Sequence, residues 1–109
     1  MVKGDRMAIR VMIERHVAPG RERELNVLLR ELRARALMQD GYISGETLVS
    51  LEDPFTHLVV STWLTLKQWQ TWEGTSERQQ FVQRINTLLL GPPRTTVWQD
   101  QGAIVAPGV

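Results

Sequence analysis

The sequence predicts an α+β domain whose elements follow the order β-α-β-β-α-β, with a four-stranded antiparallel sheet and both main helices on one face. Three observations predict it: alternating residue types near the N-terminus, apolar residues at helical spacing in two later segments, and Gly or Pro between the segments. The 109 residues fit one domain, which is large enough to bury a core without disulfides or a structural metal.

The first strand is expected over Met7 to Val17, where residue types alternate. One side of this strand carries Ile9, Val11, Ile13 and Val17, and the other carries Arg10, Met12, Glu14 and His16. After Pro19 and Gly20, Arg21 to Met38 places apolar residues three and four apart, which predicts an amphipathic helix with one face to bury.

Two further strands are expected next. Tyr42 to Leu51 forms the second, and Gly45 within it indicates a β-bulge or a close approach of another group. His57 to Leu64 has a nearly continuous apolar run, which is typical of a central strand covered on both faces. We expect this third strand to lie beside the first and parallel to it.

Two helix starts precede the last strand. Thr65 with Gln68 predicts a capping box that opens a short helix, and Ser76 with Gln79 predicts another that opens a longer one. Gly91-Pro92-Pro93 ends the longer helix, and Thr95 to Gln99 forms the fourth strand. The complete order is that of a ferredoxin-like fold.

The domain is expected over residues 7–99, with a flexible leader at 1–6 and an extended tail at 100–109. Because both main helices cover one sheet face, the other face needs a partner. We assign to that face a mixture of apolar and polar residues: Met12, Val59, Trp63, Arg10, Glu14 and His57. Such a mixture suits a subunit interface, so we expect a homodimer formed sheet against sheet.

Composition excludes several classes of function. Thirteen basic and twelve acidic residues give a net charge of +1, which argues against a nucleic-acid partner. The absence of cysteine excludes zinc-thiolate sites, iron–sulfur clusters and thiol nucleophiles, and favours a cytoplasmic location. No signal peptide or membrane span is expected. A local arginine group is interleaved with glutamates and is interpreted as a solvated helix face: Arg21, Arg23, Arg30, Arg33 and Arg35.

The segment from Ser61 to Phe81 resembles the hallmark stretch of the antibiotic biosynthesis monooxygenase family. It contains a strand that ends in Trp63, a short helix that carries Trp72, a small polar link, and a helix with an early phenylalanine. The resemblance covers about Met7 to Trp98 and implies a dimeric α+β barrel. Family members include cofactor-free oxygenases of quinol-like or anthrone-like aromatics, haem-degrading enzymes and an isomerase-type branch.

The resemblance to the haem-degrading branch is incomplete. That branch places an asparagine in the first strand, a tryptophan in the short helix and an iron-binding histidine in the next helix. Trp72 matches the tryptophan, but Ile13 stands at the asparagine position and the histidine position falls near Val82. Without an imidazole there, iron would lack its protein ligand.

The cofactor-free oxygenases need an aromatic pocket that binds a phenol or hydroquinone and stabilises its anion. The resemblance implies substrate-binding residues that line such a pocket: Trp63, Trp69, Tyr42, Phe81 and Ile13. It implies catalytic roles for Trp72 and His57, with no metal and no cofactor. Phe81 also suits a purely structural core position, as do the tryptophans.

The two histidines are not expected to form a metal pair. With the first and third strands parallel, His16 and His57 would lie roughly 20 Å apart. His57 alone is a candidate base at the mouth of the central strand. Glu14 and Glu46 are candidate inward-facing carboxylates, for which pairing with Arg10 is an equal alternative.

Three classes of function stay open. The first is a cofactor-independent monooxygenase that oxidises a small quinol- or anthrone-like aromatic with O2 in a pocket between sheet and helices. The second is a non-catalytic dimeric binding protein for a small hydrophobic ligand, and the third is a structural or regulatory module. A pocket with convergent polar groups favours the first, an apolar pocket the second, and a packed core the third.

Overall fold

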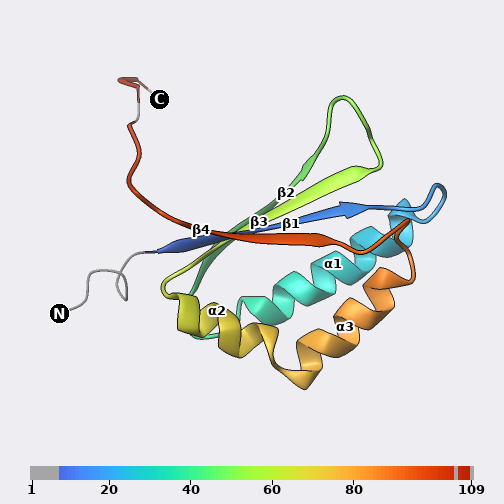
Figure 1. Cartoon of the computed structure of the whole chain (residues 1–109), viewed down its shortest axis with the longest axis horizontal. Helices are drawn as coiled ribbons and strands as arrows, with labels where there is room; N and C mark the ends of the chain where they lie inside the picture. Colours follow the sequence, from blue (N-terminus) through green and yellow to red (C-terminus); the bar gives the residue numbers. More distant parts are fainter. Residues whose placement is uncertain (1–7, 105, 109) are drawn as a thin grey trace.

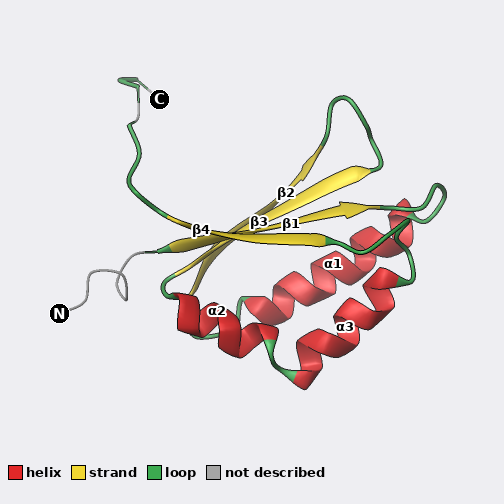
Figure 2. Cartoon of the chain, in the orientation of Figure 1, coloured by secondary structure: helices red, strands yellow, loops and turns green. Residues whose placement is uncertain are grey.

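The computed structural model describes residues 8–104 and 106–108, and the expected leader at 1–6 lies outside them. The elements are β1 (Ile9–His16), α1 (Glu22–Ala36), β2 (Tyr42–Val49), β3 (Thr56–Trp63), α2 (Leu66–Glu73), α3 (Ser76–Asn86) and β4 (Arg94–Gln99). All four strands and the three helices match expected segments, with ends that differ by a few residues. The helices lie together below the sheet (Figures 1 and 2).

The sheet has the order β2-β3-β1-β4, and every neighbouring pair is antiparallel. This confirms the four-stranded antiparallel sheet, but the expectation that β1 and β3 are parallel is wrong. Helix α1 returns the chain so that β2 runs in the same direction as β1, and the hairpin then reverses it. Strand β3 inserts between β1 and β2 and is therefore antiparallel to both.

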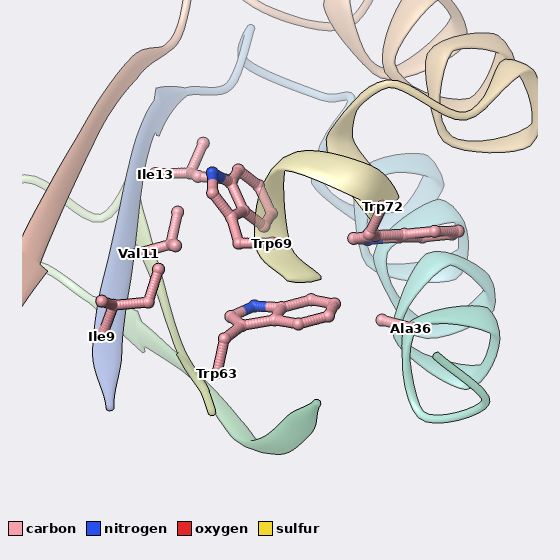
Figure 3. Packing of buried hydrophobic residues seen from close by; sticks show 7 residues of the cluster. All are labelled: Ile9, Val11, Ile13, Ala36, Trp63, Trp69 and Trp72. Carbon is pink, nitrogen blue, oxygen red and sulfur yellow. The ribbon is translucent and has the colours of Figure 1, made fainter. Parts of the chain in front are cut away.

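The helix-facing side of the sheet carries the core. In β1 the burial alternates with a period of two, as expected, and Ile9, Val11 and Ile13 face the helices. Two clusters of buried residues follow. One gathers three tryptophans against β1 (Figure 3), and the other joins Val17 and α1 to Phe81 and Ile85 of α3.

The predicted open face needs correction. Arg10, Met12 and Glu14 lie on it as expected, but register with β1 places His57, Val59 and Trp63 on the helix side. Because Leu58-Val59-Val60 is apolar throughout, its sequence has no alternation from which the inward phase could be read.

Glu14 and Glu46 also lie on the open face, and not inward. Glu14 follows the alternation of β1, and Glu46 pairs with Val60. The carboxylate of Glu14 lies 3.3 Å from His16. The expected alternative, a pair with Arg10, is not found among the described residues.

Threonine side chains fix the starts of α2 and α3. Thr65 Oγ1 accepts a hydrogen bond from the backbone N–H of Gln68 at 3.2 Å, as the predicted capping box requires. For α3 the cap is Thr75, one residue before the predicted Ser76, and it accepts from Arg78 N at 3.2 Å. The hydroxyl groups of threonine and serine cap helices in the same way, so the sequence alone does not distinguish Thr75 from Ser76 as the cap of α3.

The tail after β4 leaves the body of the domain (Figure 1). Its described residues, 100–104 and 106–108, are in no helix or strand, and the extended tail stays a prediction. Within the described part of the chain, no helix has the length and apolar character needed to cross a bilayer.

Candidate functional site

A cavity of about 60 Å³ lies between the helix-facing side of the sheet and the three helices. Its wall is formed by Ile13, Arg15, Leu29, Leu32, Arg33, Ala36, Tyr42, Gly45, Val59, Ser61, Trp63, Trp69, Trp72 and Arg78. This volume admits a few water molecules. Since typical ligand pockets measure about 300–1,000 Å³, an aromatic ligand enters this cavity only if the wall moves.

Three tryptophans form the aromatic part of the wall. Trp63 comes from the end of β3, and Trp69 and Trp72 come from successive turns of α2 (Figure 3). The rings of Trp63 and Trp69 meet edge to face, with centroids 5.7 Å apart. Trp63 donates its indole N–H to Ser61 Oγ at 3.1 Å, which fixes the orientation of that ring.

Tyr42 closes the side of the cavity nearest β2. Its ring stands at 89° to that of Trp63, with centroids 5.3 Å apart. The register shift between Tyr42 and Ser44 confirms the predicted irregularity in this strand. Gly45 lies under the phenol, because a Cβ there would come within 2.2 Å of Tyr42 Oη. The glycine therefore permits the close approach that the sequence predicted.

Burial raises the pKa of Tyr42, and nearby Arg33 partly opposes this effect. Arg33 comes from α1 and donates a hydrogen bond to Thr47 Oγ1 of β2. This bond joins the helix to the edge of the sheet and holds one guanidinium against the cavity wall. The expectation that Arg33 belongs to a solvated face is therefore wrong.

Two further arginines are buried in the wall. Arg15 faces the helices from β1 and is only 2 % exposed, and its Nε is buried without a hydrogen-bond partner. Burial, together with the charge of Arg78, lowers the pKa of Arg15 to about 10. Both effects oppose the charged form, but the group stays protonated at neutral pH.

Arg78 lies in the first turn of α3, where the Thr75 cap positions it. Its guanidinium carbon lies 4.9 Å from the centre of the Trp69 ring, a cation–π arrangement. Burial lowers the pKa of Arg78, while Glu73 acts in the opposite direction. No aspartate or glutamate is among the residues that form the cavity wall, so the charged groups of the wall are all positive.

The structure brings together most of the predicted site residues. Ile13, Tyr42, Trp63, Trp69 and Trp72 all line the cavity. Their roles in binding or catalysis stay predictions.

Phe81 and His57 lie outside the cavity wall. Phe81 packs in the second core cluster, with the guanidinium carbon of Arg35 5.0 Å from its ring centre. His57 is 5 % exposed and pairs with Arg15 in the sheet register, and its Nδ1 is buried without a hydrogen-bond partner. It lies at the start of the inner strand β3, as expected, but it is buried beside Arg15 and does not line the cavity.

The two histidines are closer in the sheet than expected. Because β1 and β3 are antiparallel, His16 pairs with Thr56, directly beside His57. The alternation of strand side chains places the two imidazoles on opposite faces of the sheet. The predicted separation along the sheet is therefore wrong. Within the described residues there is no group of three or more histidine, cysteine, aspartate or glutamate residues suited to a metal ion.

Sequence reasoning missed Arg15 and Arg78, although a signal for each was present. Arg15 stands in the inward phase of β1, between Ile13 and Val17. Arg78 precedes Phe81 by three residues and therefore shares its helix face. An arginine at an apolar position of a periodic pattern indicates a buried cation.

Comparison with known proteins identifies the family. The model of the family described as "Antibiotic biosynthesis monooxygenase" matches residues 8–84. The chain belongs to this family. The match includes the segment from Ser61 to Phe81 on which the sequence resemblance rested, and it confirms that resemblance.

Solved structures agree with this antibiotic biosynthesis monooxygenase fold. SnoaB from Streptomyces nogalater, a cofactor-independent oxygenase, has a TM-score of 0.81 and 9% identity, over 90% of this chain and 97% of its own. A conserved protein from Methanosarcina mazei has a TM-score of 0.82 and 18% identity, over 88% and 95%. A structure named antibiotic biosynthesis monooxygenase has a TM-score of 0.74 and 15% identity, over 89% and 99%. At these identities the likeness shows the fold alone. None of the curated proteins matches the chain in sequence.

Proposed function

We propose that this antibiotic biosynthesis monooxygenase family member is a cofactor-independent monooxygenase that oxidises a small phenolic aromatic with O2. The observation that carries the proposal is the aromatic cavity whose charged groups are all arginines. Such a wall binds a flat ring and favours its anion over the neutral phenol. SnoaB, which has the same fold, is a cofactor-independent oxygenase, so the fold can accommodate this class of reaction.

The proposed reaction takes all its electrons from the substrate. A bound phenolate passes one electron to O2, and the resulting phenoxyl radical and superoxide combine by forming a C–O bond at the ring carbon para to the oxygen. A proton then leaves that carbon while the O–O bond breaks, which releases water and leaves a para-quinone. A phenol with a para hydrogen and one O2 thus give one quinone and one water. In a hydroquinone the para carbon already bears oxygen, so the C–O bond forms at an ortho carbon that carries hydrogen, and the products are one hydroxyquinone and one water.

The residues of the cavity wall have distinct roles in the proposed reaction. Arg33, beside Tyr42 at the β2 side, stabilises the phenolate and the superoxide that forms from O2. Trp63 and Trp72 supply apolar surface against the ring of the substrate. The indole N–H of Trp72 has no hydrogen-bond partner among the described residues, so this N–H is free to donate to the substrate.

His57 is retained as the proposed base, although it does not line the cavity. It lies beside Arg15 on the helix-facing side of the sheet, so a proton would reach it through bound water. The alternative function, a binding protein for an aromatic anion, is favoured by the same observation, because no carboxylate or histidine forms part of the wall.

The size of the cavity narrows the substrate. At about 60 Å³ it suits a single ring better than a three-ring anthrone. We therefore place simple phenols and hydroquinones ahead of anthrones. A cytoplasmic location, inferred from the absence of cysteine, remains part of the proposal.

A homodimer completes the proposal. Proteins of this family typically dimerise. The sheet face opposite the helices carries a mixed surface that includes Met12, Trp98 and Leu48, and the last two are about half exposed. A second copy of the chain would cover this face and leave each cavity on the other side of its sheet.

The decisive experiment is oxygen uptake by metal-stripped protein with a panel of phenols, hydroquinones and anthrones. Trp72→Phe is the test variant, and Trp98→Phe, on the opposite face of the sheet, is its matched control. We expect oxygen uptake with water and quinone as products. We also expect Trp72→Phe, but not Trp98→Phe, to lower the rate of uptake about 10-fold or more. Binding of the same compounds without uptake would establish the binding protein and overturn the oxygenase.

A further inference from the structure

We propose that Arg15 and Arg78 form a subsite for a carboxylate carried by the aromatic ligand. The inference deepens the proposed function, since it rests on the same cavity and names the class of substrate. The aromatic ring would occupy the tryptophan-lined part, and the carboxylate would lie against the two guanidinium groups.

The first argument is the burial of two like charges. Arg15 and Arg78 are 2 % and 9 % exposed, and the proximity of Arg78 lowers the pKa of Arg15. Burying a charge is unfavourable unless an opposite charge or hydrogen bonds compensate it. Among the described residues, no acidic group forms an ion pair with either guanidinium, although Glu73 partly offsets the charge of Arg78.

The second argument is the supply of free donors. The Nε of Arg15 is buried and has no hydrogen-bond partner. Arg78 makes a cation–π contact with the Trp69 ring, and its guanidinium N–H groups donate no hydrogen bond to the described residues. Guanidinium edges match the two oxygens of a carboxylate in geometry.

The third argument is position. Arg15 extends from the central strand β1 and Arg78 from the first turn of α3, yet both line the cavity that the tryptophans line. The third arginine of the wall, Arg33, is already bonded to Thr47. The unpartnered positive charge is therefore at Arg15 and Arg78, and a ligand that bears both a ring and an anion would satisfy both parts of the wall.

The test compares a charged and a neutral probe of nearly the same shape, 4-hydroxyphenylacetate and 4-hydroxyphenylacetamide. Dissociation constants are measured without oxygen, from the quenching of tryptophan fluorescence. The carboxylate is expected to bind about 10- to 100-fold more tightly than the amide, as for other hydrogen bonds to charged groups. Equal affinity for the two probes would overturn the proposal.

Variants on one helix supply the matched control. Arg78→Gln is expected to remove most of the preference for the carboxylate. Arg84→Gln removes the same charge from α3 at a residue that does not line this cavity, and it is expected to retain the preference. A preference that survives Arg78→Gln, or is lost equally in both variants, would contradict the subsite. Tighter binding of 4-hydroxyphenyl phosphate than of the carboxylate would assign the site to phosphate esters.

Arg15→Met gives an independent readout. If Arg15 is retained for a ligand, removal of its unpaired charge should raise the thermal unfolding midpoint of the protein without ligand. The carboxylate probe should then no longer raise that midpoint. A lower midpoint in the empty protein would show a structural role and count against the subsite. Oxygen uptake is scored separately with 3-hydroxyphenylacetate, which carries a hydrogen para to its hydroxyl. Binding of this carboxylate without uptake overturns only the oxygenase, and uptake without carboxylate preference overturns only the subsite.

Discussion

At the scale of single residues, one side wall of the cavity depends on a residue without a side chain. Gly45 leaves room for the Tyr42 hydroxyl, and an added Cβ would come within 2.2 Å of that oxygen. The ring carbon behind the hydroxyl would be 3.4 Å from the same Cβ, a tolerable distance. The conflict is therefore confined to the hydroxyl group.

We expect Gly45→Ala to displace the phenol, lower the free energy of unfolding by about 1–2 kcal/mol and weaken binding of aromatic ligands. In a Tyr42→Phe background the same substitution should be nearly neutral, because the hydroxyl is absent. Urea denaturation of the two single variants and the double variant measures this coupling. Gly91→Ala, where a Cβ meets nothing within 4 Å, is the control. Additive effects of the two substitutions would contradict the proposed contact.

At the scale of elements, the start of α3 positions one of the site's cations. Thr75 accepts a hydrogen bond from the N–H of Arg78 and donates its hydroxyl to Trp72 O at 2.8 Å. One side chain thus links the last turn of α2, which holds a tryptophan, to the first turn of α3, which holds an arginine.

Thr75→Ala is expected to lower the free energy of unfolding by about 1 kcal/mol, as for other helix caps. It should also weaken binding of an aromatic carboxylate, since Arg78 loses its anchor. Thr75→Ser should restore both properties. The comparison is Thr87→Ala, which removes a hydrogen bond to Arg84 O at the far end of the same helix. If this second variant impaired ligand binding equally, the specific role of the cap would be rejected.

The hairpin between β2 and β3 is organised by Asp53. Its carboxylate accepts from the hydroxyl of Thr56 at 2.7 Å and from the backbone N–H of Phe55 at 3.0 Å. These bonds lower the pKa of Asp53 from its usual 3.8. When the pKa of a carboxyl group is lower in the folded than in the unfolded state, the group stabilises the fold. This stabilisation is fully present above the unfolded-state pKa and is lost as the pH falls toward the folded-state pKa.

We therefore expect the thermal midpoint to fall as the pH drops below about 3.8, and Asp53→Asn to lessen that fall. Melting curves between pH 2.5 and 6 provide the measurement. Asp40→Asn removes a carboxylate that makes no side-chain hydrogen bond to the described residues, and its profile should follow that of the unmodified protein. An unchanged acid profile in Asp53→Asn would contradict the role given to the loop.

At the scale of the whole molecule, the two faces of the sheet differ in the residues they carry. The helix-facing side holds the cavity, and the opposite side presents Trp98, which is 55% exposed and donates its indole N–H to Thr96. A large exposed aromatic on a flat surface is typical of an interface. The position of the cavity on the far side means that dimer formation need not close it.

Trp98→Glu is expected to shift the protein from dimer to monomer, because a charge would be buried at the interface. Sedimentation velocity over a range of concentrations measures the change. Leu37→Glu, at an exposed position just after α1 and away from the sheet, should leave the assembly unchanged. A monomeric unmodified protein, or a dimer that tolerates the glutamate, would reject this interface.

The sequence by itself determined the order of elements and most of the aromatic wall. Alternation in β1 and helical spacing in α1 are local patterns, and both were read correctly. Trp69 and Trp72, three residues apart on one short helix, share a buried face. These features depend on residues close together in the chain, so a linear pattern contains them.

Only the tertiary structure decided the direction and phase of β3 and the meeting of the arginines. The apolar run in β3 fits either face, and its pairing with β1 settled that His57, Val59 and Trp63 point to the helices. Arg15 and Arg78 are 63 residues apart in sequence, so a local pattern can indicate that each is buried but not that the two meet. Their convergence depends on how the packing of α3 against α1 and α2 places Arg78 near β1, and this long-range packing creates the positive wall of the cavity.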